Sequence, residues 1–480
     1  MIDEHDLRDM LRRRASAISD DPLNAPAAVR RGRRRIAATM ALTALTAAAV
    51  LTGAVAGVNA LLRTAPRVPA VPNDERILPS APSSWSAVEP PGGRIWSITA
   101  GGPGLVAVGS TAADGSGPAI WTSGDGRSWT AVEGDIGASD FHDVTTGGPG
   151  LVAISIGNSG YVPQVGIDAP VWYSTDGLEW TQAAPDPVFE GAFLHAVIAG
   201  GPGIVAVGAD REGPQAWFSA DGVTWERASV PPVPDGVHID EDHAEAWMQD
   251  VAVAGGRLVA VGSIAMSMGP NSYRYDPVMW TSTDGTTWVE VNLDPEVFTE
   301  TTEFRSVAAG PSGFVAVGQN SQTSSCCLET PGVWWSADGL AWSSVSLDQD
   351  AFVADRQSDF GVHAVAAGPG GYVAVGRDSR CRYFPRVCSV AEGAIWVSED
   401  GRSWVRVSSD PVFRVGRTGP IVMNAIAPWG SRFVAAGEYW AFEGEPPEKP
   451  RRSEGPSVLR FGVWISEAPA DHLEPADEGM

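Results

Sequence analysis

Three of the seven histidines in this 480-residue chain, His142, His195 and His363, occupy the same position, two residues before copies of a recurring phrase. The other copies of the phrase place Trp96, Gln249, Arg305 and Asn424 at that position. Neutral imidazole is a common ligand of divalent metals, and with arginine and amides it also suits anionic ligands. The shared position therefore predicts a metal or anionic-ligand site. The alternative is that these side chains satisfy main-chain groups and water at strand ends.

Two further groups could bind a ligand. The segment 231–247 contains the candidate metal ligands His238, Asp240, Asp242 and His243, which lack a fixed ligand spacing and also fit a solvated acidic loop. The longest connection, 438–460, contains Tyr439 and Trp440, close to Phe442. These aromatic residues are candidate ligand contacts, and a small local core explains them equally well.

Four cysteines, Cys326, Cys327, Cys381 and Cys388, lie in two neighbouring connections. An oxidising compartment favours disulfides, and four cysteines allow three pairings. Pairing Cys381 with Cys388 leaves an adjacent pair, so two bridges between the connections fit better. A zinc site is a further alternative. In each case the cysteines have a structural role, in which they hold the long connections in place.

The sequence contains no recognisable nucleophile–base pair, phosphate-binding loop or cofactor motif. We therefore expect no cofactor and lean against catalysis. The net charge of −25 argues against nucleic-acid binding, because phosphates require a basic surface.

The phrase that positions the first set of residues occurs seven times. Its first copy, 98–109, places two apolar runs around a Gly-Gly-Pro-Gly turn, which is typical of a β-hairpin. A third strand follows in each copy, centred on Trp121, Trp172, Trp217, Trp280, Trp334, Trp396 and Trp464. Six of these strands enter a Ser-x-Asp-Gly-x-x-Trp turn, in which Asp can bond the backbone and Gly accepts a positive φ. The closing tryptophans begin a fourth strand and are Trp129, Trp180, Trp225, Trp288, Trp342 and Trp404.

The seventh fourth strand is missing from the end of the chain. The segment 84–89 matches 128–133, yet no other strand precedes it. We expect this N-terminal strand to complete the last repeat, because a ring of sheets closes in this way without an exposed edge. The predicted fold is therefore all-β: a seven-bladed β-propeller closed by an N-terminal outer strand and preceded by a single transmembrane α-helix.

The six turns resemble the Asp-box of BNR-repeat propellers, the group that includes sialidases. The resemblance covers residues 85–466, although each turn here is one residue shorter than the family pattern. In that family the turn is structural, so the resemblance implies fold rather than function. A sialidase also needs three arginines, an Arg-Ile-Pro motif and a Tyr–Glu pair. No Arg-Ile-Pro occurs, and only Arg305 occupies the shared position.

The connections between the strands indicate which face of the propeller binds a ligand. The turns at one end of the blades are uniform, whereas the connections 231–247, 263–277, 319–331, 377–392 and 438–460 vary and share the other end. Variable loops on a rigid scaffold are usual binding surfaces. The linker enters at the uniform end, so the variable face should point away from the membrane.

The N-terminal part predicts a membrane anchor. Residues 1–35 carry nine Arg and six Asp or Glu, a net charge of +3, and 36–62 contain no charged residue. Such a length spans a bilayer, and the basic flank places the N-terminus in the cytoplasm. The alternative is a cleaved signal peptide. A Pro-rich linker, 63–84, leads to the propeller, 85–467, and an acidic tail, 468–480.

The sequence therefore predicts a single-pass cell-membrane protein with a monomeric extracytoplasmic propeller. The main hypothesis is that the propeller acts as a binding or scaffold module for a protein, peptide or cell-surface glycan. The ligand would be bound by the membrane-distal face. The alternatives are a sensor or assembly factor signalling through residues 1–35, and a sialidase-like glycoside hydrolase.

Overall fold

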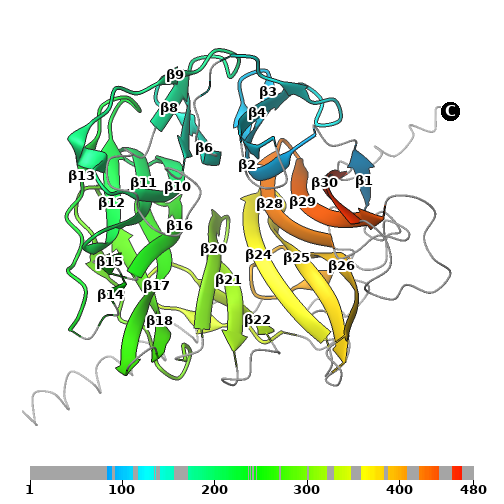
Figure 1. Ribbon diagram of the computed structural model, residues 1–480. Coiled ribbons are helices and arrows are strands. Elements are labelled where there is room, and N and C mark those ends of the chain that lie inside the picture. Colours follow the sequence, from blue (N-terminus) through cyan, green and yellow to red (C-terminus); the bar gives the residue numbers. More distant parts are fainter. Residues whose placement is uncertain are drawn as a thin grey trace, which may run out of the picture. The chain divides into compact units, whose positions relative to one another are not determined.

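The computed structural model describes the chain from residue 84 to residue 466, apart from several connecting segments, of which the longest are 156–170, 408–420 and 443–456. The propeller belongs to one compact unit, Leu78–Met480. Its described strands form seven four-stranded antiparallel sheets, arranged around a centre in Figure 1. Innermost strands contact each other from blade to blade, and the last contacts the first, so the ring is closed. The seven-bladed all-β propeller is confirmed.

Each blade contributes an innermost strand, here called strand A. These are β2 (Arg94–Gly101), β6 (Phe141–Gly147), β10 (Phe193–Gly200), β16 (Ala246–Ala254), β20 (Thr302–Gly310), β24 (Ser358–Gly368) and β28 (Ile421–Trp429). The next strands outward, B, are β3 (Gly104–Ser110), β7 (Gly150–Ser155), β11 (Gly203–Asp210), β17 (Arg257–Gly269), β21 (Gly313–Ser321), β25 (Gly371–Arg382) and β29 (Arg432–Phe442).

The outer half of each blade contains strands C and D. Strands C are β4 (Pro118–Ser123), β8 (Val171–Ser174), β12 (Gly213–Ser219), β18 (Ser272–Ser282), β22 (Glu329–Ser336), β26 (Val387–Ser398) and β30 (Ser457–Ser466). Strands D of blades 1 to 6 are β5 (Thr130–Ala131), β9 (Thr181–Gln182), β13 (Glu226–Arg227), β19 (Val289–Glu290), β23 (Ser343–Ser344) and β27 (Val405–Arg406).

The seventh blade is closed by β1 (Trp85–Val88). This strand pairs antiparallel with β30, with Trp85 opposite Ser466, and the two labels lie side by side in Figure 1. Trp85 is buried in a cluster with Trp464, so the join also has an apolar core. The predicted closure is confirmed.

The repeated tryptophans of strand C form the centres of the contacts between blades. All seven are at most 4% exposed, and each belongs to a cluster drawn from two neighbouring blades. Burying a large aromatic side chain stabilises a fold by roughly 2–3 kcal/mol. These tryptophans therefore belong to the core, as the repeat pattern predicted. The candidates for ligand contact are the polar residues.

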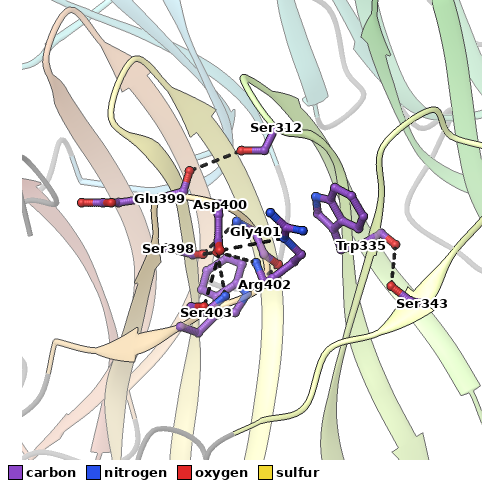
Figure 2. A network of polar contacts seen from close by, with 10 residues as sticks. Ser312, Trp335, Ser343, Ser398, Glu399, Asp400, Gly401, Arg402 and Ser403 are labelled. Carbon is purple, nitrogen blue, oxygen red and sulfur yellow. Dashed lines mark hydrogen bonds and ion pairs between the residues drawn. The ribbon is translucent and has the colours of Figure 1, made fainter. Parts of the chain in front are cut away.

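The Ser-x-Asp-Gly turns are held by their own side chains. In blade 6, Ser398 Oγ accepts the Gly401 N–H at 2.9 Å, and Asp400 Oδ1 accepts the N–H groups of Arg402 and Ser403 at 2.8 and 2.7 Å. Figure 2 shows this turn, with the Arg402 guanidinium 4.6 Å from the Trp335 ring centroid of blade 5. The turn thus also joins adjacent blades.

Three details differ from the sequence prediction. The D strands of blades 1 to 6 have two residues each and begin after the tryptophan that closes the turn, not at it. Core packing, rather than strand pairing, fixes the position of that tryptophan. Much of the predicted variable connections of blades 4 to 7 is strand, because the B and C strands keep pairing beyond the repeated phrase. The segment 231–247 contains a small hairpin, β14 (Ile239–Asp240) and β15 (His243–Ala244).

The only helical element among the described residues is a 3-10 turn, η1 (Pro187–Phe189). Within that part of the chain, no helix has the length and apolar character needed to cross a membrane. The predicted span, 36–62, lies outside the described residues.

Candidate functional site

The shared position found in the sequence is a β-bulge in every blade. One residue of each strand A is skipped by the pairing with strand B. The seven skipped residues, called the bulge ring below, are Trp96, His142, His195, Gln249, Arg305, His363 and Asn424. A bulge bends the strand and re-aims a side chain. The sequence thus identified every member of this ring.

Six of the seven bulges face a glycine in the neighbouring strand, and in blade 2 the facing residue is Ser155. In six blades strand B carries a glycine opposite the residue before the bulge: Gly109, Gly208, Gly262, Gly318, Gly376 and Gly437. A Cβ at these positions would meet a strand A carbonyl oxygen at only 1.8–2.3 Å. The Gly that ends the repeated phrase therefore permits the close approach of the two backbones.

The bulge ring surrounds a cavity of about 620 Å³ at the centre of the propeller. All seven ring residues line it. The ring lies where the A strands begin, which is the end of the blades opposite the Asp turns. This placement agrees with the predicted variable face.

Two histidines of the ring hydrogen-bond the next blade. His142 Nδ1 lies 2.7 Å from the His195 carbonyl oxygen, and His195 Nδ1 lies 3.0 Å from that of Met248. A carbonyl only accepts, so Nδ1 donates and Nε2 is the acceptor of each neutral ring. Burial lowers the pKa of both imidazoles, that of His195 to about 4. Both are therefore neutral at pH 7 and present acceptors.

Two amides of the ring are oriented by neighbouring N–H groups. His363 Nδ1 lies 3.1 Å from Asn424 Oδ1, and Trp247 Nε1 donates to Gln249 Oε1 at 3.2 Å. Each amide oxygen is thereby engaged, so the NH₂ group is the end that each amide offers as a donor. Gln249 and Asn424 belong to blades 4 and 7.

Positive charge gathers between these two amides. Arg305 of blade 5 pairs with Glu303 at 2.9 Å, and Arg377 of β25 also lines the cavity. Burial first, and then the Arg377 and Arg305 charges, lower the pKa of His363 to about 4. Gln249, Arg305, Arg377 and Asn424 thus present donors on blades 4 to 7, whereas His142 and His195 present acceptors on blades 2 and 3; the neutral His363, which donates through Nδ1, adds an Nε2 acceptor on blade 6. Sequence reasoning missed Arg377, whose signal is that it follows the bulge-facing Gly376.

Two buried carboxyl groups, also missed, directly follow His142 and Gln249 in the chain, and both line the cavity. Asp143 accepts from Ser97 Oγ at 2.6 Å and from the Val197 N–H at 2.7 Å, so it links blades 1, 2 and 3. Asp250 accepts the N–H groups of Val251 and Val307 at 2.7 and 2.8 Å. Burial raises the pKa of Asp143 to about 6 and that of Asp250 to about 7. The sequence carried a signal for these aspartates, because the position directly after the bulge residue holds Ser or Asp in four repeats.

The remaining candidate site residues either lie away from the bulge ring or fall outside the residues that the structure describes. Tyr439 is partly buried against the core shared by blades 6 and 7, while the side chain of Trp440 lies outside the described residues. Of the predicted metal ligands, His238 and Asp242 lie outside the described residues, as do Cys326 and Cys327. The described residues contain no group of three or more His, Cys, Asp or Glu that could hold a metal ion.

The comparisons with known proteins add structural likenesses only. No protein-family model matches the chain, and no curated protein matches it in sequence. Similar solved structures include a phage phi92 endosialidase (10% identity, TM-score 0.40, covering 83% of this chain and 71% of that chain). A Lactobacillus plantarum protein (11%, 0.45, 75% and 98%) and a Penicillium chrysogenum α-L-arabinanase complexed with arabinobiose (11%, 0.37, 63% and 92%) are also similar. At these identities and TM-scores the likenesses carry no information on activity or ligand.

Proposed function

We propose that the protein is a binding module that recognises an acidic glycan at the bulge ring. The observation that carries this proposal is the fixed polarity of the ring. Imidazole acceptors on blades 2 and 3 suit sugar hydroxyl groups, whereas the guanidinium and amide donors on blades 4 to 7 suit a carboxylate. A cavity of about 620 Å³ accommodates a sugar unit.

Binding rather than hydrolysis is favoured by the state of the carboxyl groups. Both oxygens of Asp143 and both of Asp250 accept hydrogen bonds from main-chain N–H groups or Ser97. Although both carboxyl groups line the cavity, each uses its two oxygens in hydrogen bonds, including bonds to neighbouring blades. The proposal also places the chain with the Asp-box propellers, supported by six turns in which aspartate bonds the turn backbone.

The proposal includes a membrane anchor at 36–62 and an extracytoplasmic propeller. The position of β1 supports this arrangement: Trp85 lies opposite Ser466, at the Asp-turn end of the blades. Trp85 and the bulge ring thus lie at opposite ends of the blades.

The test is calorimetric titration of the detergent-solubilised full chain with galacturonate and glucuronate, each compared with galactose and glucose. These pairs differ in the carboxylate alone. We expect uronates to bind at least about tenfold more tightly, and Arg305→Gln to remove that preference. Arg432→Gln, at the Asp-turn end, is the control and should change nothing. Equal affinities within each pair, or no binding of either uronate, would contradict the proposal.

A further inference from the structure

A pair of aromatic side chains leads from the bulge ring to the surface of blade 4. Trp247 precedes Gln249 by two residues and donates its Nε1–H to the amide oxygen of Gln249. Tyr275 of β18 packs edge-on against Trp247, with ring centroids 5.6 Å apart. The pair is thus joined directly to a residue that lines the cavity.

The pair faces the cationic part of the ring. Met279 lies on the same face of β18 as Tyr275, because side chains alternate along a strand, and Met279 packs in the core shared with blade 5. Tyr275 and Trp247 therefore project on the blade 5 side, above that core. Arg305 and Glu303 stand at the start of the neighbouring β20.

The pair also keeps an accessible surface. Tyr275 is 37% exposed, and it is one of six large hydrophobic side chains with this degree of exposure among the described residues. Three of the others, Leu178, Val223 and Leu340, lie in Asp turns at the opposite end of the blades. At the ring end, Tyr275 thus presents partly exposed aromatic surface that is joined to the cavity through Trp247 and Gln249.

We propose that Trp247 and Tyr275 form a second subsite, for the sugar unit next to the one held in the bulge ring. This inference rests on the proposed function and adds that the ligand is a chain of at least two units. An aromatic ring packs well against the apolar C–H face of a sugar, and the Arg305–Glu303 ion pair of blade 5 supplies polar groups for its hydroxyl groups.

The experiment compares galacturonate with its linear dimer and trimer, titrated into the full chain. We expect the wild-type protein to bind the trimer at least about tenfold more tightly than the monomer. Tyr275→Ala should reduce this ratio to below about threefold without changing the affinity for the monomer. Tyr275→Phe, which keeps the ring, and Leu178→Ala, at the opposite end, should preserve it.

The outcomes separate this inference from the proposed function. If the monomer binds but the trimer binds no more tightly, or if Tyr275→Ala keeps the full ratio, the second subsite is overturned and the acidic-glycan proposal stands. If neither galacturonate nor its oligomers bind the wild-type chain, the second subsite is overturned, and if glucuronate does not bind either, the proposed function is overturned with it.

Discussion

The Nδ1 atom of His142 lies 2.7 Å from the main-chain carbonyl oxygen of His195, one blade further along the ring. His195 in turn makes the same kind of contact with the Met248 carbonyl of the following blade. Each imidazole therefore both couples two blades and presents Nε2 as an acceptor. The structural and the ligand-binding interpretations of these histidines are compatible, because they use different nitrogens.

Replacing His195 by Asn should make folding less sensitive to acid. The folded-state pKa of His195 is about 4, below the usual pKa of 6.5 for an imidazole, because the ring is buried. Its contribution to stability is thus present above about pH 6.5 and is lost as the pH falls through about 4. His195→Asn keeps a donor for the Met248 carbonyl but does not titrate. Urea unfolding at pH 4 to 8 should show wild type losing about 2–3 kcal/mol relative to this variant on acidification. Parallel curves for the two proteins would contradict the assignment.

Asp250 should show the opposite dependence. Burial raises its folded-state pKa to about 7, above the usual 3.8 of an aspartate, so its contribution is present below about pH 4 and is lost as the pH rises through about 7. Relative to Asp250→Asn, the wild-type free energy of unfolding should fall by about 3 kcal/mol across that window. The same urea series measures it. A constant difference between wild type and variant at all pH values would show that this carboxyl group titrates normally.

A methyl group at Gly262 should disrupt the bulge of blade 4. A Cβ there would lie 2.0 Å from the Trp247 carbonyl oxygen. We expect Gly262→Ala to lower the free energy of unfolding by about 2 kcal/mol or more and to weaken any ligand that contacts Gln249. Gly124→Ala is the matched control, since its Cβ would meet only the Pro103 carbonyl oxygen at 3.7 Å. Equal, small effects of the two changes in urea unfolding would argue against the steric role of Gly262.

The backbone register singles out one cysteine pairing. Cys381 lies directly opposite Cys388 across β25 and β26. Directly opposite residues of antiparallel strands have Cα atoms about 4.5–5.5 Å apart, which suits a disulfide. In material secreted across the membrane we expect this bridge, and mass spectrometry of an unreduced proteolytic digest checks it. Detection of Cys381 or Cys388 joined to Cys326 or Cys327 would favour the bridges between connections that the sequence suggested.

Removing β1 should open the ring. A chain truncated to residues 78–480 keeps the strand, whereas one truncated to 90–480 leaves the edge of β30 unpaired. We expect the shorter chain to melt at a lower temperature and to self-associate, because an exposed edge pairs with other chains. Trp85→Ala isolates the packing part and should cost about 3–5 kcal/mol. Light scattering measures self-association of the two truncated chains, and thermal unfolding measures their melting temperatures. If both chains are monomeric and melt at the same temperature, the prediction is wrong.

The repeat pattern was sufficient to predict the blade number, the closing strand and all seven members of the bulge ring. These features recur in every copy, so alignment of the copies reveals them. Arg377, Asp143 and Asp250 were missed because their roles depend on which atoms of a neighbouring blade they face. The long hairpin of β17 and β18 was missed for a different reason: paired strands satisfy their own backbone groups and need no repeated residue to continue.

The strand that completes the seventh blade is also the first described part of the chain. Any tension applied to the polypeptide ahead of Trp85 is therefore delivered to four residues held at the outer edge of one sheet. We expect the peeling of β1 from β30 to come first, because only four residue pairs join these strands, while β2 of the first blade still packs against β28 of the last. A force sensor attached ahead of the linker should accordingly record a small early yield, followed by rupture of the blades at greater extension.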